Sequence, residues 1–345
     1  MRKQFGAKPS KIELERFSKS VHWNGTIFEN LEETNMEFSL SNMPKFLHKQ
    51  FFEKKGREPN KALPIIPFNK DVIEISNQSM QSIWYGHSAI FMRLNNTTIL
   101  IDPMFGQDAA PIAPFKVKRF SSATLEIIDS FPQIDLLLIS HDHYDHLDYD
   151  SILKLKEKTN YFYVALGVKR HLVSWGIEEN RITEFNWWEE SFFNEIKITF
   201  TPTRHFSGRG LRDRAKSLWG GWVFKTEEEN IWFSGDSGYG THFKEIGSRL
   251  GPFDFAFMEC GQYNENWHQI HMYPEETVQA ALDAGVKNCM AVHWAGFALA
   301  QHSWKEPVER FVKKAESENL KYIVPKMGEL FSFHFENNSK WWEID

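Results

Sequence analysis

Three histidines and four aspartates crowd into the ten residues HDHYDHLDYD, which run from His141 to Asp150. Imidazole and carboxylate together form a ligand set that zinc accepts readily, and that iron and manganese also accept. The preceding run, IDLLLIS, is continuously apolar, which is typical of a strand buried on both faces. Side chains two residues apart point the same way in extended backbone, so His141 and His143 can reach one metal ion. Asp145 and His146 follow as the chain turns, and they suit a second ion close by.

Four such side chains are too few for two ions, so further ligands must come from elsewhere in the chain. Three candidates stand just after predicted strands: His205 in TFTPTRHFSG, Asp236 in IWFSGDSGY and His293 in CMAVHWAG. Each of them taken alone is more often a structural residue or a turn former. The ordered set, HxHxDH followed by His, Asp and His, is far more specific. It predicts a dinuclear metal centre built at strand ends.

The elements that must position these residues alternate short β-rich runs with amphipathic segments. SIWYGHSAIFMRL, TTILIDPMF, NYFYVAL, RITEF, IKITFTPT, WGGWVFKT and FDFAFME predict strands. DYDSILKLKEK, YPEETVQAALDAG and KEPVERFVKKAESENL predict helices, the first with the acidic start that suits a helix dipole. The pattern favours one continuous α/β (α+β) domain over residues 63–345, preceded by an N-terminal extension over residues 1–62.

The bulk composition of the 345 residues is that of an ordinary globular protein, with 41% hydrophobic and 25% charged residues. A run of about 18 apolar residues, which a membrane-spanning helix needs, does not occur. The charged N-terminus lacks the apolar core of a secretory signal, so a cytoplasmic location is expected. The net charge of −6 argues against a nucleic-acid partner. Cys260 and Cys289 lie in apolar contexts and are expected to be buried thiols.

The segment Met43–Lys54 has apolar residues at helical spacing with lysines between them. A basic amphipathic helix of this kind can lie on a membrane surface, which would give the protein a peripheral membrane contact. Packing of such a helix against the main domain is the commoner arrangement and is favoured here. Self-association of the chain is compatible with both arrangements.

The motifs as a set resemble those of the metallo-β-lactamase superfamily. Within it they are most similar to the hydrolases that cleave N-acylphosphatidylethanolamine as phospholipases D, including their bacterial relatives. WYGHSAIFM, LIDPMF, LISHDHYDHLDY, FTPTRHFSGR, LWGGW, GDSGY and AVHWAGFALA occur in the family's order between about Leu63 and Met327. The resemblance implies a four-layer αββα sandwich with two zinc ions at one edge between its sheets. It also implies that Asp102, in LIDPMF, orients a ligand histidine.

The resemblance also implies an assignment of the ligands, carried over residue by residue. Each ion has three ligands of its own: His141, His143 and His205 for one, and Asp145, His146 and His293 for the other. Asp236 bridges the two ions. His271, in WHQIHMYPEE, lies beside the substrate. Asp145, Asp236 and His271 are therefore the expected catalytic residues.

The implied reaction is hydrolysis of a phosphodiester by water activated between two metal ions, with no organic cofactor. The N-acylethanolamine would leave and phosphatidate would remain. His271, or a water held by Asp145, would protonate the leaving alkoxide. Two alternatives stay open: a hydrolase acting on a lactone or another ester, and a non-catalytic metal-binding protein, which the complete ligand set disfavours.

Two groups of side chains near the predicted ligands have two interpretations each. Four tryptophans either border an acyl-chain groove or, as favoured, fill the core: Trp187, Trp188, Trp219 and Trp222. Four arginines beside His205 either hold a phosphate or form a solvated loop: Arg204, Arg209, Arg212 and Arg214.

Overall fold

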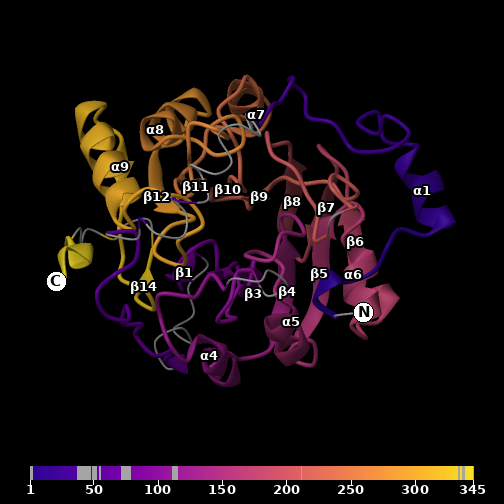
Figure 1. Ribbon diagram of the computed structural model, residues 1–345, viewed down its shortest axis with the longest axis horizontal. Coiled ribbons are helices and arrows are strands. Elements are labelled where there is room, and N and C mark those ends of the chain that lie inside the picture. The colour runs from indigo at the N-terminus through magenta and orange to yellow at the C-terminus, as the bar shows by residue number, and fades with distance from the viewer. Residues whose placement is uncertain are drawn as a thin grey trace.

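The computed structural model describes residues 3–36, 48, 53, 56–70, 79–110, 116–210, 212–332, 335 and 339–344. Two β-sheets pack face to face, and helices cover the outer face of each (Figure 1). This arrangement is the αββα sandwich that the resemblance implies. The predicted helix over Met43–Lys54 lies outside the described residues apart from His48 and Glu53, so both interpretations of it stay predictions.

The first sheet has the strand order β14-β1-β2-β3-β4-β5-β6. Its strands are β1 (Gln81–Trp84), β2 (Ile90–Leu94), β3 (Thr97–Ile101), β4 (Ile134–Ile139), β5 (Thr159–Ala165), β6 (Ile182–Phe185) and β14 (Leu330–Phe331). β1, β2 and β3 are antiparallel neighbours, whereas β3 to β6 run parallel. Its outer helices are α4 (Thr124–Ser130), α5 (Tyr149–Leu155) and α6 (Lys169–Ser174).

The second sheet has the order β13-β12-β11-β10-β9-β8-β7. Its strands are β7 (Glu190–Phe193), β8 (Ile196–Thr201), β9 (Gly221–Lys225), β10 (Asn230–Phe233), β11 (Phe255–Glu259), β12 (Asn288–Val292) and β13 (Lys321–Tyr322). β8, β9 and β10 are antiparallel neighbours, and β10 to β13 run parallel. Its outer helices are α7 (His242–Leu250), α8 (Pro274–Asp283) and α9 (Glu306–Ser317).

Strand direction explains why the loops that carry ligand-type residues meet. In the first sheet β1, β3 and β4 run in the same direction, because β2 is antiparallel to both β1 and β3. In the second sheet β8, β10, β11 and β12 run in the same direction, because β9 is antiparallel to both β8 and β10. Carboxyl ends of strands that share a direction lie at one edge of their sheet, which is where α/β folds build their sites. The apolar core between the sheets packs against the strands of both, and so fixes where these strand ends lie.

The N-terminal segment 3–36 packs on the sandwich. It contains a 3-10 turn (Lys3–Phe5) and α1 (Lys11–Phe17), which Ser10 caps in a reciprocal pair with Glu13. Phe17 and Phe28 are buried in the same hydrophobic cluster as the strands. The domain boundary at residue 62 stays a prediction, but this part of the extension is joined to the main core.

Several local predictions are refined by the structure. The run SIWYGHSAIFMRL is divided into β1 and β2 by a turn at Gly86–Ser88, where His87 has a φ of 55°. The favoured core interpretation of the tryptophans is confirmed: Trp187, Trp219 and Trp222 are buried, and Trp188 packs against the core. Cys260 and Cys289 are buried thiols, as expected. Two further 3-10 turns lie at Glu179–Arg181 and Trp341–Glu343.

None of the helices in the described part of the chain has the length and apolar character that crossing a bilayer requires.

Candidate metal centre

The structure brings all seven predicted ligand residues together at one edge of the sandwich. Four of them lie in the loop 141–147, which follows β4 of the first sheet: His141, His143, Asp145 and His146. The other three follow β8, β10 and β12 of the second sheet: His205, Asp236 and His293. The site is therefore built from both sheets, and strand-end loops supply all of its histidines.

The first predicted triad is tightly grouped. His143 Nδ1 lies 2.8 Å from His141 Nε2 and 3.2 Å from His205 Nε2. Asp236 Oδ2 lies 4.0 Å from His141 Nε2 and 3.9 Å from His205 Nε2. These four side chains thus direct one nitrogen or oxygen each toward a common point.

The second predicted triad lies on the other side of Asp236. His146 Nε2 is 3.0 Å from Asp236 Oδ2 and 3.6 Å from Asp145 Oδ2. His293 Nδ1 is 3.3 Å from Asp236 Oδ1. Asp236 consequently reaches histidines of both triads, which is the position that a bridging carboxylate needs.

Hydrogen bonds to neighbouring groups fix the tautomers of three histidines. Asp102 Oδ2 accepts from His146 Nδ1 at 2.8 Å and from Ser140 Oγ at 2.6 Å, so Ser140 Oγ accepts in turn from His141 Nδ1 at 2.9 Å. His205 Nδ1 donates to the carbonyl of Ile270 at 3.0 Å. In each neutral ring the Nε2 lone pair is then left to face the centre. Asp102 occupies the orienting position that the resemblance implies.

This donor set fits transition-metal ions. His143 Nδ1 can carry at most one proton, yet it faces two lone-pair nitrogens, His141 Nε2 and His205 Nε2, at hydrogen-bonding distance. A cation between the three rings satisfies all of them at once. With its proton on Nδ1, His146 likewise directs the lone pair of its buried Nε2 at another acceptor, Asp236 Oδ2, at 3.0 Å. The ligand types, imidazole with carboxylate, are those of zinc, iron and manganese sites.

The electrostatics of the site favour a bound cation. Burial lowers the pKa of the imidazoles well below the ordinary value for His141, His205 and His293, and to about 4 for His143. Burial alone would also lower the pKa of His146. The nearby carboxylates outweigh it and raise that pKa well above the ordinary value, chiefly those of Asp236 and Asp145. Four imidazoles that burial keeps neutral, together with carboxylates strong enough to favour a positive charge on His146, form an environment that a divalent ion stabilises.

His271 lies beside the cluster and is paired with a buried carboxyl group. Its Nδ1 is 2.9 Å from Glu259 Oε1, and its ring centroid is 5.0 Å from that of His205. Burial raises the pKa of Glu259 well above its ordinary value and lowers that of His271 to about 3. Nδ1 is occupied by this contact, so Nε2 is the ring nitrogen of His271 that Glu259 leaves unengaged.

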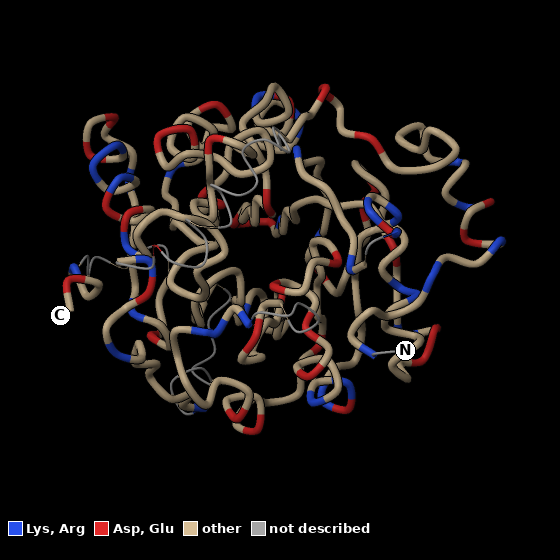
Figure 2. Tube along the Cα trace, in the orientation of Figure 1, with Lys and Arg blue, Asp and Glu red and all other residues tan. Residues whose placement is uncertain are grey.

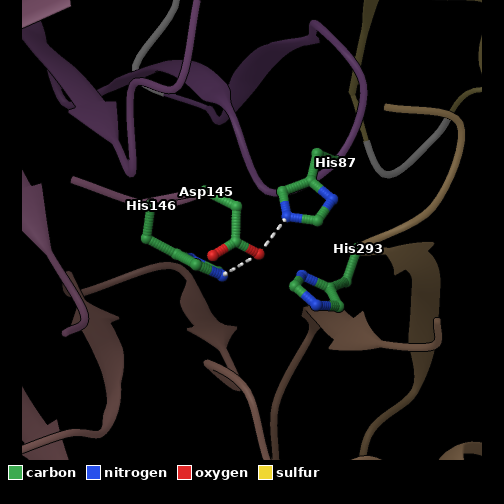
Figure 3. A group of neighbouring side chains, drawn as sticks. All are labelled: His87, Asp145, His146 and His293. Atoms are coloured by element: carbon green, nitrogen blue, oxygen red, sulfur yellow. Dashed lines mark hydrogen bonds and ion pairs between the residues drawn. The ribbon is translucent and has the colours of Figure 1, made fainter. Parts of the chain in front are cut away.

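Sequence reasoning missed two residues of this site. His87, in the turn between β1 and β2, is fully buried, and its Nε2 lies 2.8 Å from Asp145 Oδ2 (Figure 3). Its ring centroid is 4.0 Å from that of His293. The strand-end rule that found His205 also applies to His87, which follows β1. Glu259 also stands at the end of a predicted strand, FDFAFME, but the rule was applied to histidine and aspartate alone.

The interpretations of the arginine cluster need correction for two members. Arg209 is 2% exposed, and it donates to the carbonyls of Asp142 at 2.8 Å and Leu147 at 2.7 Å, so it braces the loop 141–147 from behind. Arg204 donates to the Tyr239 carbonyl at 3.1 Å. Both guanidinium groups donate hydrogen bonds to backbone carbonyls of the protein itself, so neither the phosphate-site nor the solvated-loop interpretation describes them. Arg212 and Arg214 are exposed, as the solvated-loop interpretation expects.

Comparison with known proteins identifies the class of this fold and site. Residues 97–294 match the family described as "Beta-lactamase superfamily domain". The chain belongs to this superfamily, and it is a metal-dependent hydrolase of the metallo-β-lactamase type with a candidate His/Asp metal-binding cluster.

Individual relatives are similar over most of the chain. An uncharacterised protein of Mycobacterium bovis is 39% identical over 250 residues, covering 71% of this chain and 67% of that protein. The N-acyl-phosphatidylethanolamine-hydrolyzing phospholipase D 1 of Caenorhabditis elegans is 29% identical over 341 residues, covering 92% and 95%. Igni18, a metallo hydrolase from Ignicoccus hospitalis, has a TM-score of 0.58 at 20% identity over 74% of this chain and 99% of its own. This last likeness concerns the fold alone.

Proposed function

We propose that this protein is a dinuclear metal phosphodiesterase that hydrolyses N-acylphosphatidylethanolamine to N-acylethanolamine and phosphatidate. The observation that carries the proposal is the position of Asp236 between two triads of ligand-type side chains. Two metal ions held a few ångströms apart suit in-line displacement at phosphorus. The Caenorhabditis elegans relative, which bears the name of this phospholipase activity, supports the choice of substrate.

In this proposal His141, His143 and His205 would hold one ion, Asp145, His146 and His293 would hold the other, and Asp236 would contribute to both. When bound, such a pair, most simply two zinc ions, would supply an activated water and charge stabilisation at the phosphoryl oxygens. Asp102 keeps His141 and His146 in the tautomers that present Nε2. Each proposed ligand would therefore present a lone pair to an ion, and Asp102 holds two of the histidines in the orientation that this requires.

His271 is proposed to serve the leaving group. Glu259 holds its Nδ1, so the ring presents Nε2 beside His205 and His293, with ring centroids 5.0 and 5.2 Å away. A proton held at Nε2 can pass to the N-acylethanolamine alkoxide as the P–O bond breaks. Burial favours the protonated form of Glu259. This carboxyl group can pass its proton to Nδ1 as Nε2 releases its own, so the ring stays neutral during the transfer.

The surroundings of the centre support a substrate with apolar parts. Phe206 lies 4.6 Å from His143 between ring centroids, and Phe297 lies 5.3 Å from His87. A cavity of about 450 Å³ beside His205 has a mixed lining, in which Leu31, Phe206 and Ile270 lie beside Glu29, Glu32 and Glu33, and this volume is in the range of ligand pockets. Basic and acidic residues are intermixed along the described chain (Figure 2), which suits a small substrate better than a nucleic acid.

The test compares kcat/KM on three substrates by protein whose metal content has been measured. These are N-acylphosphatidylethanolamine in mixed micelles, a soluble aryl phosphodiester and a homoserine lactone, with Asp236→Ala protein as the control for contaminating activity. We expect both phosphodiesters to exceed the lactone. A lactone preference of about a hundredfold, roughly 2.7 kcal/mol in transition-state binding, would overturn the proposal. Activity on the soluble diester alone would keep the chemistry and remove the lipid.

A further inference from the structure

We infer that the N-terminal segment 3–36 is a working part of the metal centre, and that Asn30 is a positioning residue for His205. The inference rests on the proposed function, in which His205 binds the first ion. The segment belongs to the predicted N-terminal extension, and its contacts with the loops of His205 and His271 give it a more specific role.

The first observation is a reciprocal amide pair. Asn30 Nδ2 donates to the His205 carbonyl at 2.8 Å, and the His205 backbone N–H donates to Asn30 Oδ1 at 3.0 Å. The side-chain amide thus satisfies both backbone polar groups of one residue, as a neighbouring strand would. His205 lies in a loop beyond the end of β8, where the sheet itself offers no such partner.

The second observation is that the ring of His205 is fixed as well. Its Nδ1 donates to the Ile270 carbonyl at 3.0 Å, and the residue is 2% exposed. With N–H, C=O and Nδ1 all engaged, Nε2 is the one polar atom of His205 that is left for a ligand. Asn30 supplies two of the three hydrogen bonds that orient this nitrogen.

The third observation is that Asn30 is itself anchored. Its Oδ1 also accepts from Trp219 Nε1 at 3.1 Å, and Trp219 is 1% exposed. Two residues earlier, the Phe28 N–H donates to the Ala215 carbonyl at 2.9 Å, and the Phe28 ring is buried in the main core. The position of the Asn30 amide is therefore set by the packed sandwich.

The same segment also ties neighbouring loops of the site together. Arg204, next to His205, donates to Thr34 Oγ1 at 3.0 Å and to the Glu33 carbonyl at 2.6 Å. The Asn35 N–H donates to Gln269 Oε1 at 2.8 Å, in the loop that carries His271. A segment that only covered the core would not need hydrogen bonds to both of these loops.

The experiment measures metal retention in Asn30→Ala, Asn30→Asp and a matched control, Asn24→Ala. Asn24 lies in the same segment, and its Oδ1 accepts from the Thr26 and Ile27 N–H groups at 2.9 Å each, so its described side-chain bonds stay within the segment. Competition with a chelator gives zinc affinity, the absorption bands of the cobalt-substituted protein report ligand geometry, and thermal unfolding of the metal-free proteins reports folding.

Outer partners of ligand residues are worth about 10–100-fold in metal affinity, so we expect a loss of that size in Asn30→Ala, with shifted cobalt bands. Asn30→Asp keeps the acceptor and loses the donor, and its affinity should lie between those of Asn30→Ala and the wild type. Asn24→Ala should retain metal like the wild type, even if its unfolding temperature falls as far as that of Asn30→Ala.

Wild-type affinity and spectrum in Asn30→Ala would overturn the inference, as would an equal loss in Asn24→Ala. If Asn30→Ala does not fold, the comparison of Asn30→Asp with Asn24→Ala decides in the same way. A wild-type protein that holds no metal and hydrolyses no ester would instead contradict the proposed function. The two failures are thus distinguishable.

Discussion

At the scale of single residues, Asp236 and His271 differ in what their removal should do. Asp236 lies within 3.0–4.0 Å of histidine nitrogens from both predicted triads, whereas His271 contacts Glu259 and is proposed to serve the leaving group. We expect His271→Ala to lower turnover by about a hundredfold with full metal content, the usual size of a lost proton-transfer group. Asp236→Ala should lower turnover further and lose metal. Elemental analysis with steady-state kinetics checks both, and near-normal turnover of Asp236→Ala with two metals would refute its bridging assignment.

His87 gives a second prediction at this scale. Its Nε2 is the hydrogen-bond partner of Asp145 Oδ2 at 2.8 Å, and its backbone is held at a positive φ of 55°, which a histidine adopts only where surrounding contacts enforce it. His87→Ala should free the Asp145 carboxylate and weaken retention of the second ion by about 10–100-fold. His87→Gln, which keeps a donor, should restore part of the loss. Equal chelator resistance in all three proteins would count against a positioning role.

A site residue could be predicted from the sequence where its signal is local, and could not where its role depends on a partner far along the chain. His205, Asp236 and His293 stand directly after strands, so the local pattern reveals them. Asn30 has no local signal, because its meaning depends on a loop 175 positions further along the chain. Contacts of that kind come from tertiary structure, which a single sequence does not encode locally.

At the scale of elements, α7 shows why some helices were not predicted. It contains Gly247, a residue that weakens a helix by about 1 kcal/mol relative to alanine. A Cβ at this position would come within 2.6 Å of the Ala284 backbone, so close packing against the end of α8 requires the glycine. Tertiary packing has overridden propensity here. β7 was missed for another reason: it is an edge strand whose burial alternates weakly.

The start of α7 also carries a prediction about pH. Burial lowers the pKa of His242 from 6.5 to about 4, with Glu32 opposing this shift and Arg204 adding to it. Between these values the unfolded chain binds the proton and the folded chain does not. Stability from the neutral ring is therefore complete above pH 6.5 and is lost as pH falls toward 4.

The measurement is the free energy of unfolding between pH 7.5 and 4.5 for wild type and His242→Gln, which keeps a polar group near Ser237 Oγ. We expect the wild type to lose up to about 3 kcal/mol more than the variant over this interval. Parallel curves for the two proteins would show that His242 does not contribute to acid sensitivity.

At the scale of the whole molecule, the αββα architecture was within reach of the sequence because strand and helix patterns are strong and the motifs resemble a known superfamily. The order of the strands was not, since pairing depends on which buried faces fit together. β14, near the end of the chain, joins the first sheet beside β1. The consequence for function is that the two sheets meet at the metal centre, which takes ligands from each.

Metal removal should therefore weaken the whole sandwich and not one loop alone. Of the proposed ligands, His141, His143, Asp145 and His146 extend from the first sheet, and His205, Asp236 and His293 extend from the second, so bound ions would cross-link the two layers. An ion that binds only the folded state adds about 2.7 kcal/mol of stability at a free concentration one hundred times its Kd. Without ions the buried carboxylates at the centre repel one another, which lowers stability further.

The measurement is the unfolding temperature of one preparation as purified, after chelation and dialysis, and after zinc is restored. We expect a fall of several degrees on chelation and full recovery with zinc, since 1 kcal/mol shifts the midpoint of a large domain by roughly 2–4 °C. Asp236→Ala, with its centre already broken, should respond much less to either treatment. Identical unfolding temperatures for metal-loaded and metal-free wild type would mean that the ions do not join the sheets. The sandwich would then hold the site in its metal-ready shape through packing and the hydrogen bonds of Asp102, Ser140 and Asn30.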